Sequence, residues 1–517
     1  MKSSNVWMVS SLIMIAPYVS SDEQGPNRIE SAMFFHSQIK DAGYGACEMT
    51  YSDGQLTFPK ATSAPAISCP DAWAWKGFIE AVKGEFWVNW ATDETIWPTD
   101  PVSLTNCKTV GWGGTSGGKP TGVGDFIEQA SECPYYPADF YRGTSERPIA
   151  NYKLDETAGH PNGPLSSVDA GRVIRQQESE IVYRNKPMFD YIKDNGLYYT
   201  EGLANAFSKA SGESDSSPTR RRWGNSVQFP VDSVMFKVDW IPLPVMQQQG
   251  LIPEGSWKKG RPIPQPKQNP YITTLMPYQK NGDAGGPLTP YYLVSVTASS
   301  KAIPTWHWYA FEHVNNKGRC DFIGCNDSFG YLNANSGSDP ANFISPHTMP
   351  DGLGDVIFDL GKAYMAEPLG GDLVALLATV GIGHGEAAFG NKPAPQQSAW
   401  LNYRLKGSQT TFTTNYGIPT VVGQSVTEGG FVNTSSCMTC HVQASVQASG
   451  EPANPGVGQS WFLSEIGYNN VFNGSPDPSW FFEAGTNDFS AVQTDFVWGI
   501  LNANSCRKSH PGSTLCD

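Results

Sequence analysis

Charged residues are scarce in this 517-residue sequence, and basic residues are the scarcer kind. Charged residues make up 16% of the chain, with 35 Lys and Arg against 49 Asp and Glu, for a net charge of −14. A nucleic-acid-binding protein needs a positive face to neutralise phosphates, yet the longest basic run here is Arg220-Arg221-Arg222. The composition therefore argues against nucleic acid as a partner and predicts a soluble protein with an acidic surface.

Long hydrophobic runs are missing after the first residues. The stretch Val6–Val19 is mostly apolar, follows Lys2 and ends in small residues before Asp22. This pattern predicts a signal peptide over residues 1–21. The strongest later candidate, Leu373–Ile382, is too short to span a bilayer. We therefore expect an exported protein whose mature form has no membrane span.

Histidine is rare as well, with eight in the chain, but one of them belongs to a distinctive motif. Cys437-Met438-Thr439-Cys440-His441 is the single Cys-x-x-Cys-His sequence present. In c-type haem attachment the two thiols add to the haem vinyl groups, and the adjacent histidine ligates the iron from the proximal side. The motif thus predicts one covalent haem c, with His441 as a metal ligand. The alternative is a Cys437–Cys440 disulfide with His441 incidental.

The other eight cysteines are consistent with export, because disulfides persist in oxidising compartments. Pairing of neighbours is the simplest hypothesis, namely 47–69, 107–133, 320–325 and 506–516. Sequence alone does not fix connectivity, and one or two free buried thiols are the alternative.

Gly (53) and Pro (39) are abundant, which favours turns and short strands over long helices. We predict an α+β fold with a β-rich middle, helical segments and a haem-attachment segment near the C-terminus. The expected regions after the signal peptide are a mixed, partly helical region at 22–225, a β-rich region at 226–395 and a haem-binding region at 396–517.

Several elements can be placed by pattern. Helix formers and apolar spacing predict helices over Trp73–Trp90, Ala170–Tyr191 and Thr200–Ala210, and helical character over 360–382. Alternation with β-branched residues predicts strands over Val231–Trp240, Tyr291–Ala298, Thr305–Val314 and Ala399–Thr413. The Pro-rich stretch 241–290 is expected to wrap the surface of a domain.

Four stretches resemble large bacterial periplasmic mono-haem proteins of the cytochrome c family. They are Thr305–Asn316, Asn402–Gly407, Gly417–Thr420 and the motif segment Ser435–His441, which together cover under a tenth of the chain. The resemblance implies haem binding, electron transfer and a bacterial periplasmic or secreted location. The implied partner is a redox partner protein or a small-molecule substrate, with neither identified.

The sixth iron ligand is the open question, because no methionine follows Met438. It comes from the downstream His510, from an upstream residue, or from none. The upstream candidates are His307, His313, His347, His384, Met349 and Met365. We favour His307 and His313, because alternation along a strand puts them on one face with Tyr309 and Phe311, while Glu312 points to the other face. Structural roles for both histidines are the alternative.

Arg404 and Lys406 precede the motif and are candidates to neutralise the haem propionates, although most basic side chains are simply solvated. Three functions compete: an electron-transfer cytochrome, a peroxidase- or oxygenase-type oxidoreductase with an open iron position, and a haem-based binding or sensing module. Whether the protein is an enzyme stays open. The missing downstream methionine and the size of the chain support the enzyme, and we favour the electron carrier.

Overall fold

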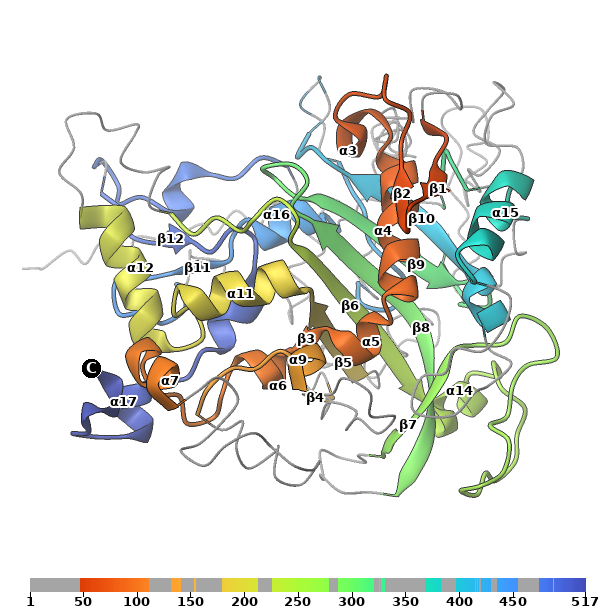
Figure 1. The fold of residues 1–517 in the computed structure, drawn as a ribbon, viewed down its shortest axis with the longest axis horizontal. Coiled ribbons are helices and arrows are strands. Elements are labelled where there is room, and N and C mark those ends of the chain that lie inside the picture. Colours follow the sequence, from red (N-terminus) through yellow and green to blue (C-terminus); the bar gives the residue numbers. More distant parts are fainter. Residues whose placement is uncertain are drawn as a thin grey trace, which may run out of the picture.

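The fold is α+β and is built around one large antiparallel sheet (Figure 1). The computed structural model describes residues 47–110, 132–140, 153–154, 179–212, 226–278, 287–319, 325, 327–330, 368–382, 397–413, 415, 417, 420–428, 435–453, 474–486 and 488–517. The expected signal peptide lies outside these residues.

The sheet has eight strands in the order β10-β9-β8-β6-β5-β3, with β4 paired to β5 and β7 paired to β8. Every pairing is antiparallel. The strands are β3 (Ala91–Thr92), β4 (Lys153–Leu154), β5 (Ser179–Arg184), β6 (Val234–Pro242), β7 (Thr273–Pro277), β8 (Leu288–Ser300), β9 (His307–His313) and β10 (Tyr403–Gln409). Two small two-stranded sheets are separate from it. One is the hairpin of β1 (Thr50–Ser52) with β2 (Gln55–Thr57), and the other pairs β11 (Ser445–Val446) with the distant β12 (Val492–Gln493).

Helices pack around the sheet and toward its edges. They are α3 (Pro65–Ser68), α4 (Pro70–Lys83), α5 (Phe86–Asn89), α6 (Asp93–Ile96), α7 (Leu104–Val110), α9 (Pro137–Phe140), α11 (Lys186–Asp194), α12 (Thr200–Gly212), α14 (Leu243–Gln248), α15 (Gly371–Thr379), α16 (Cys437–His441) and α17 (Cys506–Ser509). The 3-10 turns are η3 (Gln397–Asn402), η8 (Pro478–Trp480), η9 (Trp498–Asn502) and η10 (Thr514–Cys516).

One face of the sheet is apolar and is covered by α4, which lies across β9 and β10 (Figure 1). Pro70 begins this helix. Its missing backbone N–H costs nothing there, because the first N–H groups of a helix have no intrahelical acceptor. Its Trp75 and Phe78 rings pack on Phe311 of β9, with centroids 4.9 and 4.3 Å apart. Tyr309 continues the same face, so every other residue of β9 enters this core, which we call the α4 face.

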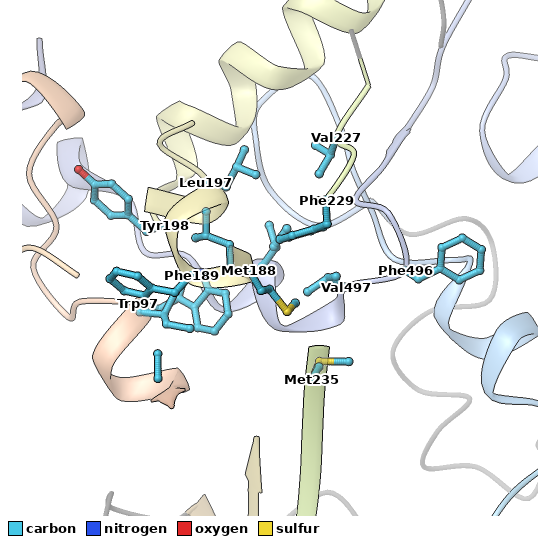
Figure 2. Packing of buried hydrophobic residues seen from close by; sticks show 14 of the residues in the cluster. Trp97, Met188, Phe189, Leu197, Tyr198, Val227, Phe229, Met235, Phe496 and Val497 are labelled. Atoms are coloured by element: carbon cyan, nitrogen blue, oxygen red, sulfur yellow. The ribbon is translucent and has the colours of Figure 1, made fainter. Parts of the chain in front are cut away.

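The opposite face meets a second core, formed by α11, α12 and the C-terminal segments. Figure 2 shows part of it, where Met188 and Phe189 of α11 approach Met235 of β6 and Val497. The same core contains Trp308 of β9 and Met438 of α16. This second face therefore carries the segment that holds the Cys-x-x-Cys-His motif, and we call it the motif face.

The strands predicted around β6, β8, β9 and β10 are confirmed, as are the helices at α4 and α12. The helix predicted over Ala170–Tyr191 is wrong at Ser179–Arg184, which is the central strand β5. The connector 241–290 contains α14 and β7, so it is not without structure. Strands from all three expected regions join one sheet, because β5 pairs with β6 and β10 pairs with β9.

Three of the expected disulfides are present: Cys47–Cys69, Cys107–Cys133 and Cys506–Cys516. Cys325 is also disulfide-bonded, while Cys320 lies outside the described residues. Among the helices that the structure describes, none has the length and apolar character that crossing a membrane requires.

Candidate haem-attachment site

The motif forms the short helix α16 and is fixed at its start. Ser436 caps the helix by accepting from the Thr439 backbone N–H at 3.3 Å. Gln409 at the end of β10 accepts from the Met438 N–H at 3.1 Å. Cys437 is buried and Cys440 is partly exposed. Their i, i+3 spacing puts both thiols on one side of the helix.

The two motif cysteines differ from all other cysteines that the structure describes. Cys437 and Cys440 form no disulfide, whereas the other described cysteines are disulfide-bonded. Burial raises the pKa of the Cys437 thiol, and the nearby Glu428 carboxylate raises it further. Cys437 is therefore a neutral thiol at neutral pH, without the low pKa of a reactive thiolate.

His441 is held in one orientation by a backbone carbonyl. Its Nδ1 lies 2.8 Å from the carbonyl oxygen of Phe496. Because that oxygen can only accept, Nδ1 carries the proton and Nε2 keeps its lone pair, the arrangement of histidine ligands in metal sites. Burial lowers the pKa of His441 to about 3, so the ring is neutral. The Trp308 ring packs against it with centroids 4.4 Å apart.

The Phe496 carbonyl is positioned by a strained turn. Asp495 and Phe496 have φ of 51° and 68°, a left-handed conformation that is unfavourable for residues other than glycine. Asp495 is anchored by the Lys301 ammonium at 2.5 Å and by the Phe229 N–H at 2.7 Å. This anchoring fixes the acceptor for His441. The sequence analysis missed these residues, since a backbone acceptor 55 residues after the motif leaves no pattern.

His307 and His313 lie on the α4 face and not on the motif face. Tyr309 and Phe311, which share their side of β9, belong to the core under α4. Trp308, which points the other way, contacts His441. The alternation was predicted correctly, but the sheet itself separates both histidines from the motif. The structure therefore does not bring them together with His441 as iron ligands.

Each of the two histidines has surroundings of its own. The His313 ring stacks on Tyr271 at 3.6 Å, its Nε2 lies 3.3 Å from the Pro270 carbonyl, and its Nδ1 accepts from the Asn315 N–H. His307 is fully buried, and neither ring nitrogen has a hydrogen-bond partner of good geometry among the described residues. Burial lowers the pKa of both histidines to about 3.

The two basic residues proposed for the propionates have protein partners. Arg404 donates to the carbonyls of Leu401 and Tyr403 at 2.6 and 3.0 Å. Lys406 is 3.2 Å from the Glu312 carboxylate, and both side chains are almost fully buried. Glu312, set aside in the sequence analysis because it faces away from His307, is thus on the motif face and in a buried ion pair.

Of the remaining candidates for the sixth ligand, His510 is the one that the structure describes. His510 follows α17, where its Nε2 lies 3.2 Å from the Asp100 carbonyl. The other four, His347, His384, Met349 and Met365, lie outside the described residues. Within the described ranges no group of three or more His, Cys, Asp or Glu is arranged to hold a metal ion.

The residues present fit a covalently attached haem. Two cysteines without a disulfide on one side of α16 match the two attachment points, and a neutral, oriented imidazole directly follows them. The cysteine pair, the Phe496 carbonyl and Trp308 come from three separate segments that the motif face brings together. Comparison with protein-family models, curated proteins and solved structures finds no match.

Proposed function

We propose that this protein is an exported mono-haem c-type cytochrome that transfers electrons. The hydrogen bond from His441 Nδ1 to the Phe496 carbonyl carries the proposal, because it leaves the Nε2 lone pair available beside two cysteines that form no disulfide. A disulfide with an incidental histidine would not require this orientation. The cofactor would be one haem c, which when bound supplies one-electron oxidation and reduction.

The chain's own residues supply attachment and orientation. Cys437 and Cys440 would hold the haem through two thioethers, each from addition of S–H across one vinyl double bond. His441 would present Nε2 to the iron, while Phe496 and Trp308 hold its ring. The disulfides are compatible with the proposed periplasmic or secreted location. The partner would be a redox protein or a small-molecule substrate, and the acidic balance disfavours nucleic acid.

A haem-dependent oxidoreductase with an open iron position, of peroxidase or oxygenase type, is the second candidate. One observation favours it: both histidines of β9 lie on the far side of the sheet, so neither is placed to complete the coordination. An open sixth position would admit a small ligand or a substrate.

The test is expression of the full chain with haem-maturation machinery, followed by a denaturing gel stained for haem and by absorption spectra. We expect haem to stay with the polypeptide, to be lost from the Cys437→Ala/Cys440→Ala variant and to be retained in the control His510→Gln. A chain without covalent haem would overturn the proposal. A reduced spectrum that carbon monoxide leaves unchanged supports the carrier, and one that shifts supports the open site.

A further inference from the structure

A row of polar side chains, four of them ionisable, crosses the motif face. The antiparallel register aligns one residue from each of five strands, namely Glu180, Asp239, Ser295, Glu312 and Arg404. Four residues along β9 from Glu312 lies Trp308, the contact of His441. At about 3.3 Å per residue, the two positions are about 13 Å apart on the same face.

Two carboxylates of the row have a cationic partner. Glu180 pairs with Lys237 at 2.7 Å, with both side chains partly exposed, and Glu312 pairs with the buried Lys406 at 3.2 Å. Asp239 is fully buried, and it has no ion pair among the described residues. It is therefore the carboxyl group of this row for which the charged form is the least stabilised.

The hydrogen bonds of Asp239 are made by one oxygen. Its Oδ2 accepts from the Ser295 and Thr427 hydroxyls at 2.5 and 3.0 Å and from the Gln424 amide at 3.0 Å. Its Oδ1 has no hydrogen-bond donor in the described structure. An unpartnered buried carboxylate oxygen is costly, and a proton on that oxygen removes the cost by making the group neutral.

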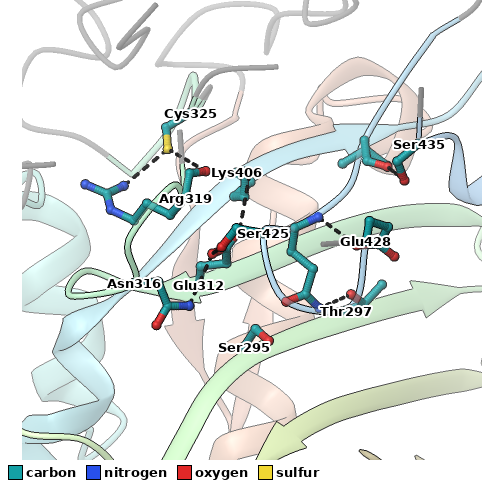
Figure 3. A network of polar contacts seen from close by, with 12 residues as sticks. Ser295, Thr297, Glu312, Asn316, Arg319, Cys325, Lys406, Ser425, Glu428 and Ser435 are labelled. Carbon is teal, nitrogen blue, oxygen red and sulfur yellow. Dashed lines mark hydrogen bonds and ion pairs between the residues drawn. The ribbon is translucent and has the colours of Figure 1, made fainter. Parts of the chain in front are cut away.

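The segment Thr420–Glu428, which we call the strap, connects this row with the motif. At one end, Val422 forms a bridge with Ser436, and its carbonyl lies 3.6 Å from the Cys437 sulfur. At the other end, Gln424 and Thr427 bind Asp239. The strap also binds the next carboxylate of the row, because Ser425 donates to Glu312 through its N–H and its hydroxyl. Figure 3 shows the part of this network around Glu312, with Ser425 and Lys406 beside its carboxylate.

Charged groups around Asp239 act on both the row and the motif. The pKa of Asp239 is raised to about 7, first by burial and then by Glu180 on β5, while Lys237 on β6 opposes the rise. β8 contributes the neutral Ser295, and the strap carries Glu428, whose charge acts on Lys237 and on Cys437. Beyond β8, Glu312 and Lys406 neutralise each other. The Lys237 charge also lowers the pKa of His441, so the same ammonium group acts on both the motif and this row.

We propose that Asp239 is a proton site coupled to electron transfer at the haem motif, an inference that rests on the proposed function. When a redox partner donates one electron to the site, the Asp239 carboxylate takes up one proton from solvent and becomes a carboxylic acid. When the electron leaves, the proton returns to solvent. The partly exposed Glu180–Lys237 pair next to Asp239 is the point at which the row reaches water.

The strength of the coupling follows from the spacing. Asp239 lies two strands, or about 10 Å, across the sheet from Glu312, so it is about 16 Å from Trp308. A charge added at about that distance, at an effective dielectric constant of about 20, changes the proton affinity of Asp239 about sixfold. Coupling is reciprocal, so protonation of Asp239 changes the redox equilibrium by the same factor. For a one-electron couple a tenfold change corresponds to about 59 mV, so the midpoint potential should fall by about 45 mV in total as Asp239 loses its proton between pH 5 and 9.

The test is a spectroelectrochemical titration of the full haem-loaded chain over this pH range, with Asp239→Asn as the main variant. We expect Asp239→Asn to lose the fall in potential that the wild-type protein shows around neutral pH. Two further variants keep the carboxyl group and shift the pH at which the fall occurs. Glu180→Gln removes a negative neighbour and moves it to lower pH, whereas Thr427→Val removes a hydrogen bond to the carboxylate and moves it to higher pH.

A second measurement does not depend on the potential. The infrared difference spectrum between reduced and oxidised protein should contain a carboxylic-acid band that Asp239→Asn lacks. If the potential of the haem-loaded wild-type protein changes with pH in the same way as that of Asp239→Asn, and the infrared band is absent, the proposed proton site is wrong. The proposed cytochrome function would then still stand. Absence of covalent haem would overturn both proposals.

Discussion

Replacing His307 with phenylalanine should make the protein more resistant to acid. His307 is fully buried in the α4 face, and neither ring nitrogen has a partner of good geometry among the described residues. Burial lowers the pKa of His307 to about 3, although the Pro70 backbone opposes this. The folded protein therefore keeps His307 neutral at pH values where the unfolded chain protonates it.

The sign and size follow from proton linkage. The ordinary pKa of histidine is about 6.5, so below that pH the unfolded state binds a proton that the folded state refuses. The contribution of His307 to the free energy of unfolding falls from about pH 6.5 toward pH 3. At pH 5, about 1.5 units below the ordinary pKa, this contribution has fallen by about 1.36 kcal/mol per unit. The free energy of unfolding is therefore lower by about 2 kcal/mol than at pH 7. Phenylalanine has no such loss.

The assay is urea unfolding of wild type and His307→Phe at pH 7 and pH 5, followed by tryptophan fluorescence. A change in packing alters the free energy of unfolding equally at both pH values. The difference in that free energy between pH 7 and pH 5 therefore isolates the titration of His307. Tyr309→Phe is the matched control, because it lies on the same face of the same strand and does not titrate in acid. Equal pH dependence in His307→Phe and wild type would refute a buried, neutral His307. An unchanged haem spectrum in His307→Phe would confirm that this residue is not an iron ligand.

Three further changes test how the site is supported, each by the denaturant midpoint at pH 7. Asp71→Ala removes a carboxylate that accepts three hydrogen bonds from the loop after Cys325 and from β10, and we expect a loss of about 4 kcal/mol. Replacing both members of Cys506–Cys516 by alanine opens a short loop and should cost about 3 kcal/mol. Gly450→Ala places a Cβ 2.0 Å from the Thr200 carbonyl at φ +81°, so we expect a loss above about 2 kcal/mol. Gly54→Ala, with a similar φ and open space, is the control and should cost about 1 kcal/mol. If any of these changes leaves the denaturant midpoint at its wild-type value, the corresponding contact does not stabilise the fold.

Local pattern was sufficient for much of the fold. Alternation predicted β9 and the face that His307 shares with Tyr309, and neighbour pairing predicted three disulfides. Pattern failed at β5, where Ser179–Arg184 follows a run of helix formers and becomes a strand because it pairs with β3 and β6. Such a choice is made by tertiary contacts that a single sequence does not display.

The motif was predictable from sequence, and its surroundings were not. Alternation says that His307 and Trp308 point to opposite sides of a strand, but not which side receives α16. That choice depends on α4, whose Trp75 and Phe78 occupy the other face and leave Trp308 to the motif. The Phe496 carbonyl is equally hidden, because any residue can supply a backbone oxygen and only the fold determines which one does.

The size of the chain is a weaker sign of enzymatic activity than the sequence alone indicated. A haem-binding region at 396–517 would be a separable unit if it had its own core, but β10 is an edge strand whose Tyr403 and Leu405 pack into the core under α4. The acceptor of the His441 proton depends on Asp495, which is held by Lys301 and Phe229 from the middle of the chain.

The parts of the chain before residue 396 are therefore needed to orient His441 in the proposed haem site. A protein that only carried electrons would still require them, because the orientation of His441 depends on contacts from the middle of the chain. The Lys301–Asp495 pair is the critical link, since without Lys301 the Asp495 carboxylate, at 5% exposure, would be buried without its cationic partner. Lys301→Met should disturb the iron spectrum although the residue lies far from the motif in sequence, whereas Lys76→Met, which breaks a surface pair with Glu80 on α4, should not. If both variants keep the wild-type spectrum, the turn at Asp495 does not depend on the rest of the fold, and chain length again becomes an argument for an enzyme.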